Sequence, residues 1–199
     1  MTEAVQILKG LQELGLKKAI ATPHINHYYN NKPNELIRCY YDVVKEVMKH
    51  DLEISLGLAA EYMLDADFAR HLQNGELLSL NDRFLLVELP HRQNWNQVTV
   101  FLNEIKLRGL RPVVAHPERH HYLSGSDQYY EKLRDAGCSF QLNMLSPLGI
   151  YGEDSARCAQ NILKRDWYDF VGTDIHSTLQ LGQLENCRFK TRFLNHIFL

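Results

Sequence analysis

The stretch RPVVAHPER, residues 111–119, is the part of this sequence that decides the fold. Its first part, 111–115, is a short apolar run that leads directly into His116, and Arg119 follows shortly after. Short apolar runs bounded by turn residues are typical of buried strands. Polar side chains directly after such strands are typical of α/β proteins, which build their sites at the carboxyl ends of parallel strands.

The same pattern repeats along the chain, with helical periodicity between the apolar runs. We expect strands at 17–22, 53–58, 84–89, 111–115, 139–142 and 169–172. We expect helices at 3–14, 34–50, 95–108, 128–136 and 155–164, a short helix before the third strand, and a last helix within 179–199. Strands that alternate with helices predict a parallel sheet with helical crossovers.

Polar residues follow nearly all of the expected strands, and this distribution distinguishes a barrel from an open doubly wound sheet. In an open doubly wound sheet they would gather at one switch point, whereas in a barrel they surround the carboxyl-terminal face. We therefore predict a barrel-like α/β fold. No repeat, low-complexity tract or linker divides the chain, so residues 1–199 are expected to form a single domain.

Composition excludes several classes of function. The chain carries 22 Lys and Arg against 24 Asp and Glu, so no basic surplus is available for a nucleic-acid backbone. No apolar run reaches the roughly 18 residues of a membrane span, and the N-terminus lacks the layout of a secretory signal. Four widely spaced cysteines, expected to be free thiols, favour a cytoplasmic protein: Cys39, Cys138, Cys158 and Cys187.

Six side chains at the predicted strand ends are candidate metal ligands. They are His24, Glu61, Glu88, His116, Asp174 and His176. Imidazole and carboxylate ligands suit Mn, Fe, Zn or Mg. Asp174 and His176 are two apart in a segment expected to be extended, which would point both to the same side. Two or more such ions can polarise a phosphoryl group and generate hydroxide near neutral pH.

Each candidate also has a plainer interpretation. A single His after a strand is commonly a loop or hydrogen-bonded core residue, and Glu61 can be a solvated loop acid. Glu88 lies within an apolar run, where a buried carboxylate must be paired or metal-bound. Chance does not readily explain ligand-type side chains at five strand ends, so the joint pattern favours a metal site.

Other polar residues near these strand ends have two interpretations each. Arg119 can bind phosphate oxygens as a bidentate fork, or form a structural salt bridge with Glu118. His120 and His121 are expected to be exposed loop residues. The loop containing His27, Tyr28, Tyr29 and Asn30 is suited to stacking on a substrate ring, or is surface decoration. No GxSxG, P-loop, GxGxxG or Cys-x5-Arg pattern supports another chemistry.

Several stretches resemble the polymerase and histidinol phosphatase (PHP) superfamily, and within it the bacterial tyrosine-protein phosphatases of capsule and exopolysaccharide operons. They are AIATPH (19–24), LVELP (86–90), PVVAHPER (112–119), QLN (141–143) with Ser146 and Gly149, Tyr151-Gly152, and FVGTDIHS (170–177). The similarity runs in order through nearly the whole chain. The AHPER and GxDxHS stretches together are fairly specific for this branch.

This resemblance implies a fold, a reaction and a partner. The fold would be a distorted parallel β/α barrel, TIM-like, with the six candidate ligands holding a divalent metal cluster that is usually manganese. Arg119 would be the phosphate-binding and catalytic arginine. The reaction would be hydrolysis of phosphotyrosine by metal-bound hydroxide, on the C-terminal tail of a bacterial tyrosine kinase of polysaccharide synthesis. The resemblance leaves the oligomeric state open.

The sequence departs from the family at its start. Family members open with a strand that carries a His-x-His pair, and we expect the first strand of the barrel to be missing here, which would leave sheet edges unpaired. Two alternatives therefore remain beside the protein phosphatase. One is a small-molecule phosphatase of histidinol-phosphate type, and the other is a catalytically impaired remnant that binds without hydrolysis.

Overall fold

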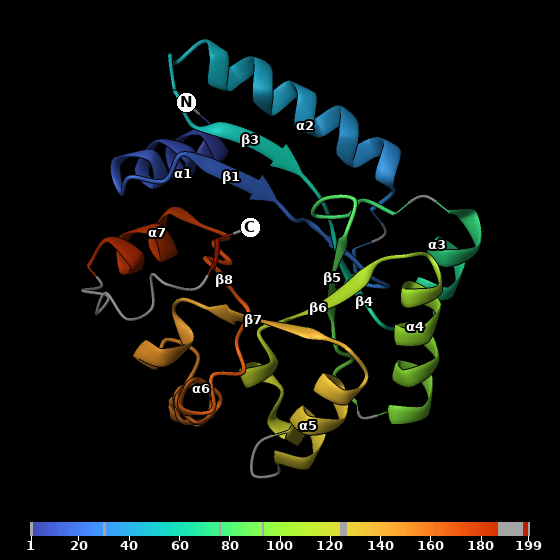
Figure 1. Cartoon of the computed structure of the whole chain (residues 1–199). Coiled ribbons are helices and arrows are strands. Elements are labelled where there is room, and N and C mark those ends of the chain that lie inside the picture. The colour runs from blue at the N-terminus through green and yellow to red at the C-terminus, as the bar shows by residue number, and fades with distance from the viewer. Residues whose placement is uncertain are drawn as a thin grey trace.

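The computed structural model describes residues 2–29, 31–75, 77–92, 94–123, 127–186 and 197–198 (Figure 1). Its helices are α1 (Glu3–Glu13), α2 (Pro33–Met48), α3 (Phe68–Asn74), α4 (Trp95–Leu107), α5 (Asp127–Asp135), α6 (Glu153–Lys164) and α7 (Thr178–Glu185). Its strands are β1 (Lys18–Ala21), β2 (His24–Ile25), β3 (Ser55–Leu58), β4 (Glu61–Met63), β5 (Phe84–Glu88), β6 (Arg111–Ala115), β7 (Ser139–Asn143), β8 (Phe170–Gly172) and β9 (Ile197–Phe198).

All of these strands pair in parallel. Seven form one sheet in the order β2-β4-β5-β6-β7-β8-β9, and β1 pairs with β3 in a second sheet. The strands curve around a central space and the helices lie outside them (Figure 1). The predicted α/β class with parallel strands is confirmed, in a form consistent with a distorted barrel.

Proline explains why the first strand segment ends at Ala21 and a separate strand, β2, begins at His24. Pro23 lies between β1 and β2, and it has no backbone N–H to donate to a neighbouring strand. Hydrogen bonds continue on both sides of the break, from the Ala59 N–H to the Ala21 carbonyl and from the Glu61 N–H to the Pro23 carbonyl. The ladder therefore resumes after the break and places His24 opposite Glu61. Glu61 begins a strand of its own, where we had expected it to follow one.

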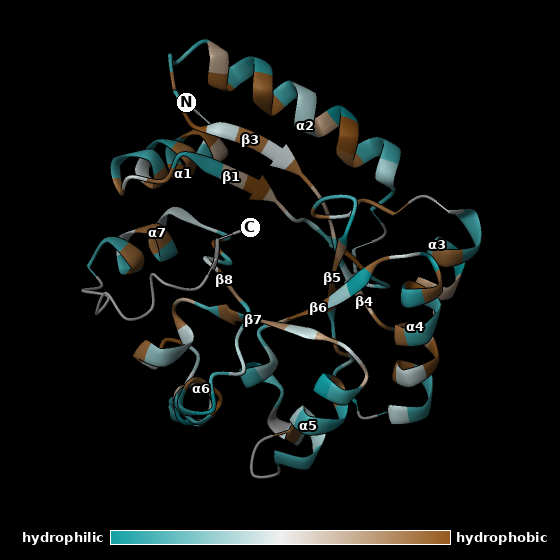
Figure 2. Ribbon diagram, in the orientation of Figure 1, coloured by the Kyte–Doolittle hydropathy of each residue, from teal (hydrophilic) through white to brown (hydrophobic). Residues whose placement is uncertain are grey.

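The core lies mainly between the seven-stranded sheet and its outer helices. Leu85 and Val87 of β5 face this outer core, whereas Leu86 between them faces a smaller cluster with Val113 and Phe170. This alternation is the period-two geometry of a strand. A further cluster joins α1, α7 and the region of β3. Most strands carry hydrophobic or intermediate residues, and hydrophilic and hydrophobic residues alternate along the helices (Figure 2).

The described C-terminal residues contain one helix and, at 197–198, a short strand within the range where helix was expected. The last helix, predicted within 179–199, is α7, which ends at Glu185. Residues 187–196, and with them Cys187, lie outside the described residues. The three described cysteines, Cys39, Cys138 and Cys158, are free thiols.

The β1 edge borders a cavity. Within the described ranges, β3 is the only strand that pairs with β1. A cavity of about 480 Å³ extends from α1, β1 and β3 to the residues that follow β8. The expected absence of an opening strand stays a prediction.

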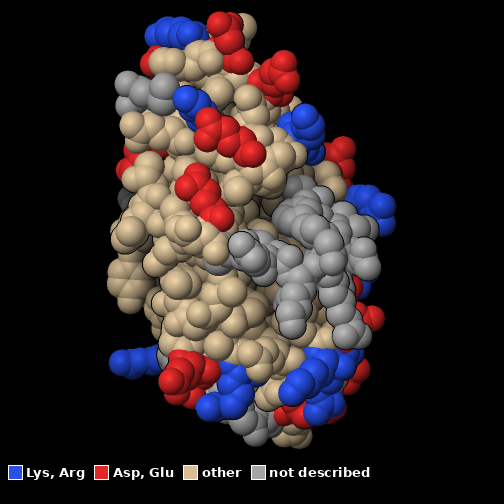
Figure 3. Space-filling model, turned by 90° about the vertical axis from the view of Figure 1, so that its left-hand side faces the viewer, with Lys and Arg blue, Asp and Glu red and all other residues tan. Residues whose placement is uncertain are grey.

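One face of the surface carries charged side chains of both signs (Figure 3). Basic and acidic side chains are interspersed at the upper and lower ends of the face shown in Figure 3, and uncharged atoms dominate between them. None of the described helices is long and apolar enough to cross a membrane.

Candidate metal centre

The six candidate ligands come together at one end of the strands. We call His24, Glu61, Glu88, His116, Asp174 and His176 the strand-end cluster. His116 Nε2 lies 3.1 Å from Glu61 Oε1. His24 Nδ1 lies 3.9 Å from a carboxylate oxygen of both Glu61 and Glu88, and His24 Nε2 lies 3.3 Å from His176 Nε2. Parallel pairing brings these residues together, because carboxyl ends of parallel strands meet at one edge.

Two members of the cluster adopt a strained backbone. His116 has φ of 31° and Asp174 has φ of 50°, both in the left-handed region. Such non-glycine conformations cost roughly 1–3 kcal/mol and concentrate at functional sites. The expectation of an extended segment through Asp174 and His176 is therefore wrong, since β8 ends at Gly172. The left-handed turn still directs the Asp174 carboxylate into the cluster, while His176 lies at its exposed rim.

Arg119 pairs with the cluster instead of with Glu118. Its guanidinium donates to Asp174 Oδ2 at 2.8 Å and lies over the Tyr151 ring, 4.1 Å from the ring centroid. The Asn143 side-chain amide donates to the same Asp174 oxygen at 2.7 Å. Glu118 faces away and accepts hydrogen bonds from the Asn143 N–H and the Tyr168 hydroxyl.

Burial and mutual charge shift the pKa values of the cluster. Burial opposes the charged form of Glu61, but the neighbouring His116 outweighs it, so the pKa of Glu61 is lowered. Burial also opposes the charged form of His116, yet Glu61 raises the pKa of His116 to about 9. At Glu88, burial and the Glu61 carboxylate together raise the pKa to about 7. At Glu88, therefore, no positive neighbour outweighs the effect of burial, as His116 does at Glu61.

The donor set fits a divalent metal ion. Three groups of ligand atoms lie within 4.8 Å of one another: His24, Glu61 and Glu88; Glu61, His116 and Asp174; and Glu88, His116 and His120. Among the described residues, the buried Nδ1 atoms of His24 and His116 have no hydrogen-bond partner. Buried polar atoms are normally satisfied, and a bound cation would satisfy ligand nitrogens of this kind.

Three neighbouring residues were not recognised as part of the site. His120 is buried, with 6% of its surface exposed, although we expected an exposed loop residue. Its spacing of four residues from His116, across a short turn, was a signal that could have indicated proximity. Asn143 and Tyr151 had appeared only as matches to the family. The side chain of His121 lies outside the described part of the chain.

The aromatic loop after β2 lies beside the cluster. Asn26 is buried, and its side-chain oxygen accepts the backbone N–H groups of Tyr28 and Tyr29. Both tyrosines are exposed, and the Tyr29 ring stacks on His24 at a centroid distance of 5.7 Å. Asn30 lies outside the described residues. The loop thus presents aromatic rings at the mouth of the site.

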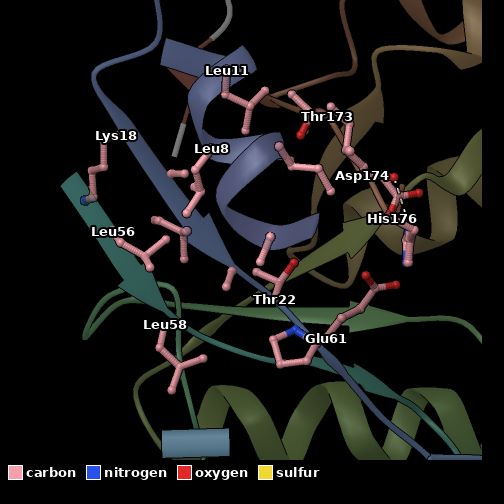
Figure 4. A pocket seen from close by; sticks show the side chains of 18 of the residues that line it. Leu8, Leu11, Lys18, Thr22, Leu56, Leu58, Glu61, Thr173, Asp174 and His176 are labelled. Carbon is pink, nitrogen blue, oxygen red and sulfur yellow. Dashed lines mark hydrogen bonds and ion pairs between the residues drawn. The ribbon is translucent and has the colours of Figure 1, made fainter. Parts of the chain in front are cut away.

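The cavity connects this polar region to an apolar interior. Glu61, Asp174 and His176 lie at one end of it, and Leu8, Leu11, Leu56 and Leu58 lie toward the other (Figure 4). Carboxylates at the border of such an apolar space are poorly hydrated, which strengthens their interaction with any cation.

Comparison with known proteins gives the family. The family model "Capsular polysaccharide synthesis, CpsB/CapC" matches residues 1–191. This chain belongs to that family. The tyrosine-protein phosphatase CpsB of Streptococcus pneumoniae is 29% identical over 184 residues, which cover 88% of this chain and 75% of that protein. The tyrosine-protein phosphatase YwqE of Bacillus subtilis (strain 168) is 25% identical over 177 residues, which cover 88% and 70%.

A solved structure has the same fold. It belongs to the work "Crystal structures of YwqE from Bacillus subtilis and CpsB from Streptococcus pneumoniae, unique metal-dependent tyrosine phosphatases". The TM-score is 0.81 at 24% sequence identity, and the match covers 90% of this chain and 73% of that chain. This likeness confirms the parallel β/α architecture.

Proposed function

We propose that this protein is a metal-dependent phosphatase that hydrolyses phosphotyrosine on protein substrates. The observation that carries the proposal is the convergence of the strand-end cluster on one site, with Arg119 directly beside it. Relatives of this chain are named tyrosine-protein phosphatases, and the similar solved structures are described as metal-dependent.

The roles of the residues follow from their chemistry. We assign His24, Glu61, Glu88, His116, Asp174 and His176 to holding divalent metal. Bound there, such ions would polarise the phosphoryl group and lower the pKa of a water molecule. The carboxylates supply negative charge, and burial of Glu61 and His116 limits competing hydration, so these two ligands interact more strongly than they would in water.

Arg119 is the residue that we assign to the phosphoryl group. Asp174 and the Tyr151 ring hold its guanidinium at the site, where one third of the side chain is still exposed. A guanidinium presents parallel N–H donors that match two phosphoryl oxygens. Arg119 can therefore orient the substrate and stabilise the charge that develops during transfer.

The proposal extends to the metal, the natural substrate and the location. Manganese is the metal that we propose, because the N and O donor set suits it. The natural substrate that we propose is the C-terminal tail of a tyrosine kinase of capsule or exopolysaccharide synthesis, consistent with the family description. Free thiols at three described cysteines support a reducing, cytoplasmic location.

Turnover of a phosphotyrosyl peptide by Mn²⁺-loaded protein tests the function. We expect hydrolysis by the wild type, and a loss of at least 100-fold in kcat/KM for Arg119→Ala, since a transition-state donor is worth about that much. Arg157→Ala removes an exposed arginine of α6 and should leave activity unchanged. Absence of both bound metal and turnover in the wild type would overturn the proposal. Faster turnover of histidinol phosphate would favour the small-molecule alternative.

A further inference from the structure

We propose that His120 is a further metal ligand, which acts together with Glu88 and His116. The inference rests on the proposed metal centre, but it does not depend on the identity of the substrate. It adds a further imidazole beside Glu88 and His116.

The geometry places three ligand atoms around one position. One atom each of Glu88, His116 and His120 lies within 4.8 Å of the other two. The His116 and His120 rings face each other at a centroid distance of 6.0 Å and an interplanar angle of 29°. All three side chains are largely removed from solvent. Two imidazoles and a carboxylate, with positions left open, are the ligand set of many catalytic zinc and iron sites.

The chain holds His120 in this position through local contacts. After the left-handed turn at His116, residues Pro117–Arg119 form a single 3-10 turn, and the His120 N–H donates to the Pro117 carbonyl. The Tyr122 ring lies 5.7 Å from the His120 ring. The Tyr122 hydroxyl donates to the carbonyl of Pro90, two residues after Glu88. The turn that carries His120 is thereby tied to the strand end that carries Glu88.

The charge balance at Glu88 also favours a cation there. His116 is shared between two groups, with Glu61 and Asp174 on one side and Glu88 and His120 on the other. His120 places a further imidazole beside Glu88, on the same side of His116 as that carboxylate, while Nε2 of His116 is directed at Glu61.

Metal binding by three variants tests this assignment. His120→Ala removes the ligand, and His120→Gln keeps much of its volume. His91→Ala is the matched control, because His91 is an exposed histidine near the mouth that belongs to none of the three groups. Mn²⁺ per chain is counted by elemental analysis after gel filtration, Mn²⁺ affinity is measured by calorimetry, and thermal midpoints are compared with Mn²⁺ and with EDTA.

We expect His120→Ala to lower the affinity for one Mn²⁺ ion by at least 10-fold. Even residues that only hydrogen-bond to metal ligands change metal affinity by about 10–100-fold when they are mutated. The thermal midpoint should fall in Mn²⁺ and change little in EDTA, and His120→Gln should behave in the same way. His91→Ala should keep wild-type affinity. The visible absorption of Co²⁺-loaded protein should also change in both His120 variants.

Two outcomes would overturn the assignment of His120 as a ligand, and neither would by itself overturn the proposed phosphatase function. Wild-type Mn²⁺ affinity in both His120 variants, or an equal fall of the thermal midpoint in Mn²⁺ and in EDTA, would show that His120 only packs. Peptide hydrolysis by the wild type would then still support the phosphatase. Conversely, His120-dependent metal binding without any turnover would support the ligand and reject the phosphatase.

Discussion

Two buried carboxyl groups, those of Glu118 and Glu61, differ in the partners that the protein gives them. Glu118 accepts one hydrogen bond from the Asn143 N–H at 3.0 Å and another from the Tyr168 hydroxyl at 2.9 Å. Glu61, equally buried, faces histidines and another carboxylate. Neutral donors surround the first group, and ionisable groups surround the second.

The difference separates a carboxyl with a structural role, Glu118, from one that we propose to bind metal, Glu61. A buried carboxyl with neutral partners needs no cation, and burial raises the pKa of Glu118. In the strand-end cluster, three carboxylates lie beside one another and beside imidazoles, which together form a ligand set for a divalent ion. The predictions below test this contrast, beginning with the largest expected effect.

Removal of His116 should have the largest effect. His116→Ala leaves Glu61 buried without its nearest partner, and breaking such a pair typically costs about 3–5 kcal/mol. Urea unfolding in EDTA should show this loss, and peptide hydrolysis should become undetectable. His50→Ala is the control, because His50 pairs with Glu46 at the surface, and its stability should match the wild type. An unchanged unfolding free energy in His116→Ala would contradict the ion pair.

Addition of Mn²⁺ should stabilise the cluster and not the Glu118 site. At a free concentration of 100 times Kd, binding contributes about 2.7 kcal/mol. The thermal midpoint should therefore rise in the wild type and in Glu118→Gln, and fail to rise in Glu61→Gln. A missing rise in Glu118→Gln, with its fold intact, would show that the two carboxyls are not separate in function.

Loss of Glu118 should cost stability without removing metal. Glu118→Ala leaves the Asn143 N–H and the Tyr168 hydroxyl without their acceptor. Each buried donor left unsatisfied lowers the free energy of unfolding by about 1–3 kcal/mol. Chemical denaturation measures the loss, and elemental analysis should find the wild-type amount of metal. Tyr168→Phe, which removes one donor, should cost less than Glu118→Ala. Equal loss of metal in Glu118→Ala and Glu61→Ala would contradict the different roles proposed for the two carboxyl groups.

The pH dependence of the metal-free protein should report Glu88. Its folded pKa of about 7 exceeds the ordinary 4.5, so its contribution to stability is present below pH 4.5 and lost as pH rises through 7. His116, with a folded pKa of about 9 against 6.5, loses its contribution as pH rises through 9. Thermal midpoints in EDTA should fall across both windows. Glu88→Gln should remove the lower window and keep the upper one.

The smallest effect should come from Tyr151. Its ring lies over the Arg119 guanidinium, an interaction worth about 0.5–2 kcal/mol. Tyr151→Ala should raise KM for a phosphotyrosyl peptide several-fold, whereas Tyr151→Phe keeps the ring and should stay within twofold of the wild type. Equal KM in all three proteins would show that the ring does not position Arg119.

Much of the fold follows from local sequence pattern. The helix over 95–108 and the strand over 111–115 were predicted to within one residue, because apolar periodicity and glycine stops act over a few neighbouring residues. The residues of the strand-end cluster could also be named in advance. Each follows, ends or begins a short strand, and parallel pairing brings such ends together whatever the details of closure.

The tertiary structure alone decided the partners of these residues. Arg119 pairs with Asp174, 55 residues away, and not with the adjacent Glu118. The burial of His120 and the left-handed turn at Asp174 likewise depend on how distant strands close around the site. Sequence pattern determined which chemical groups reach the carboxyl ends of the strands. Long-range packing decided which are buried, which are satisfied, and which are left for a metal, because burial and charge depend on neighbours that pattern does not specify.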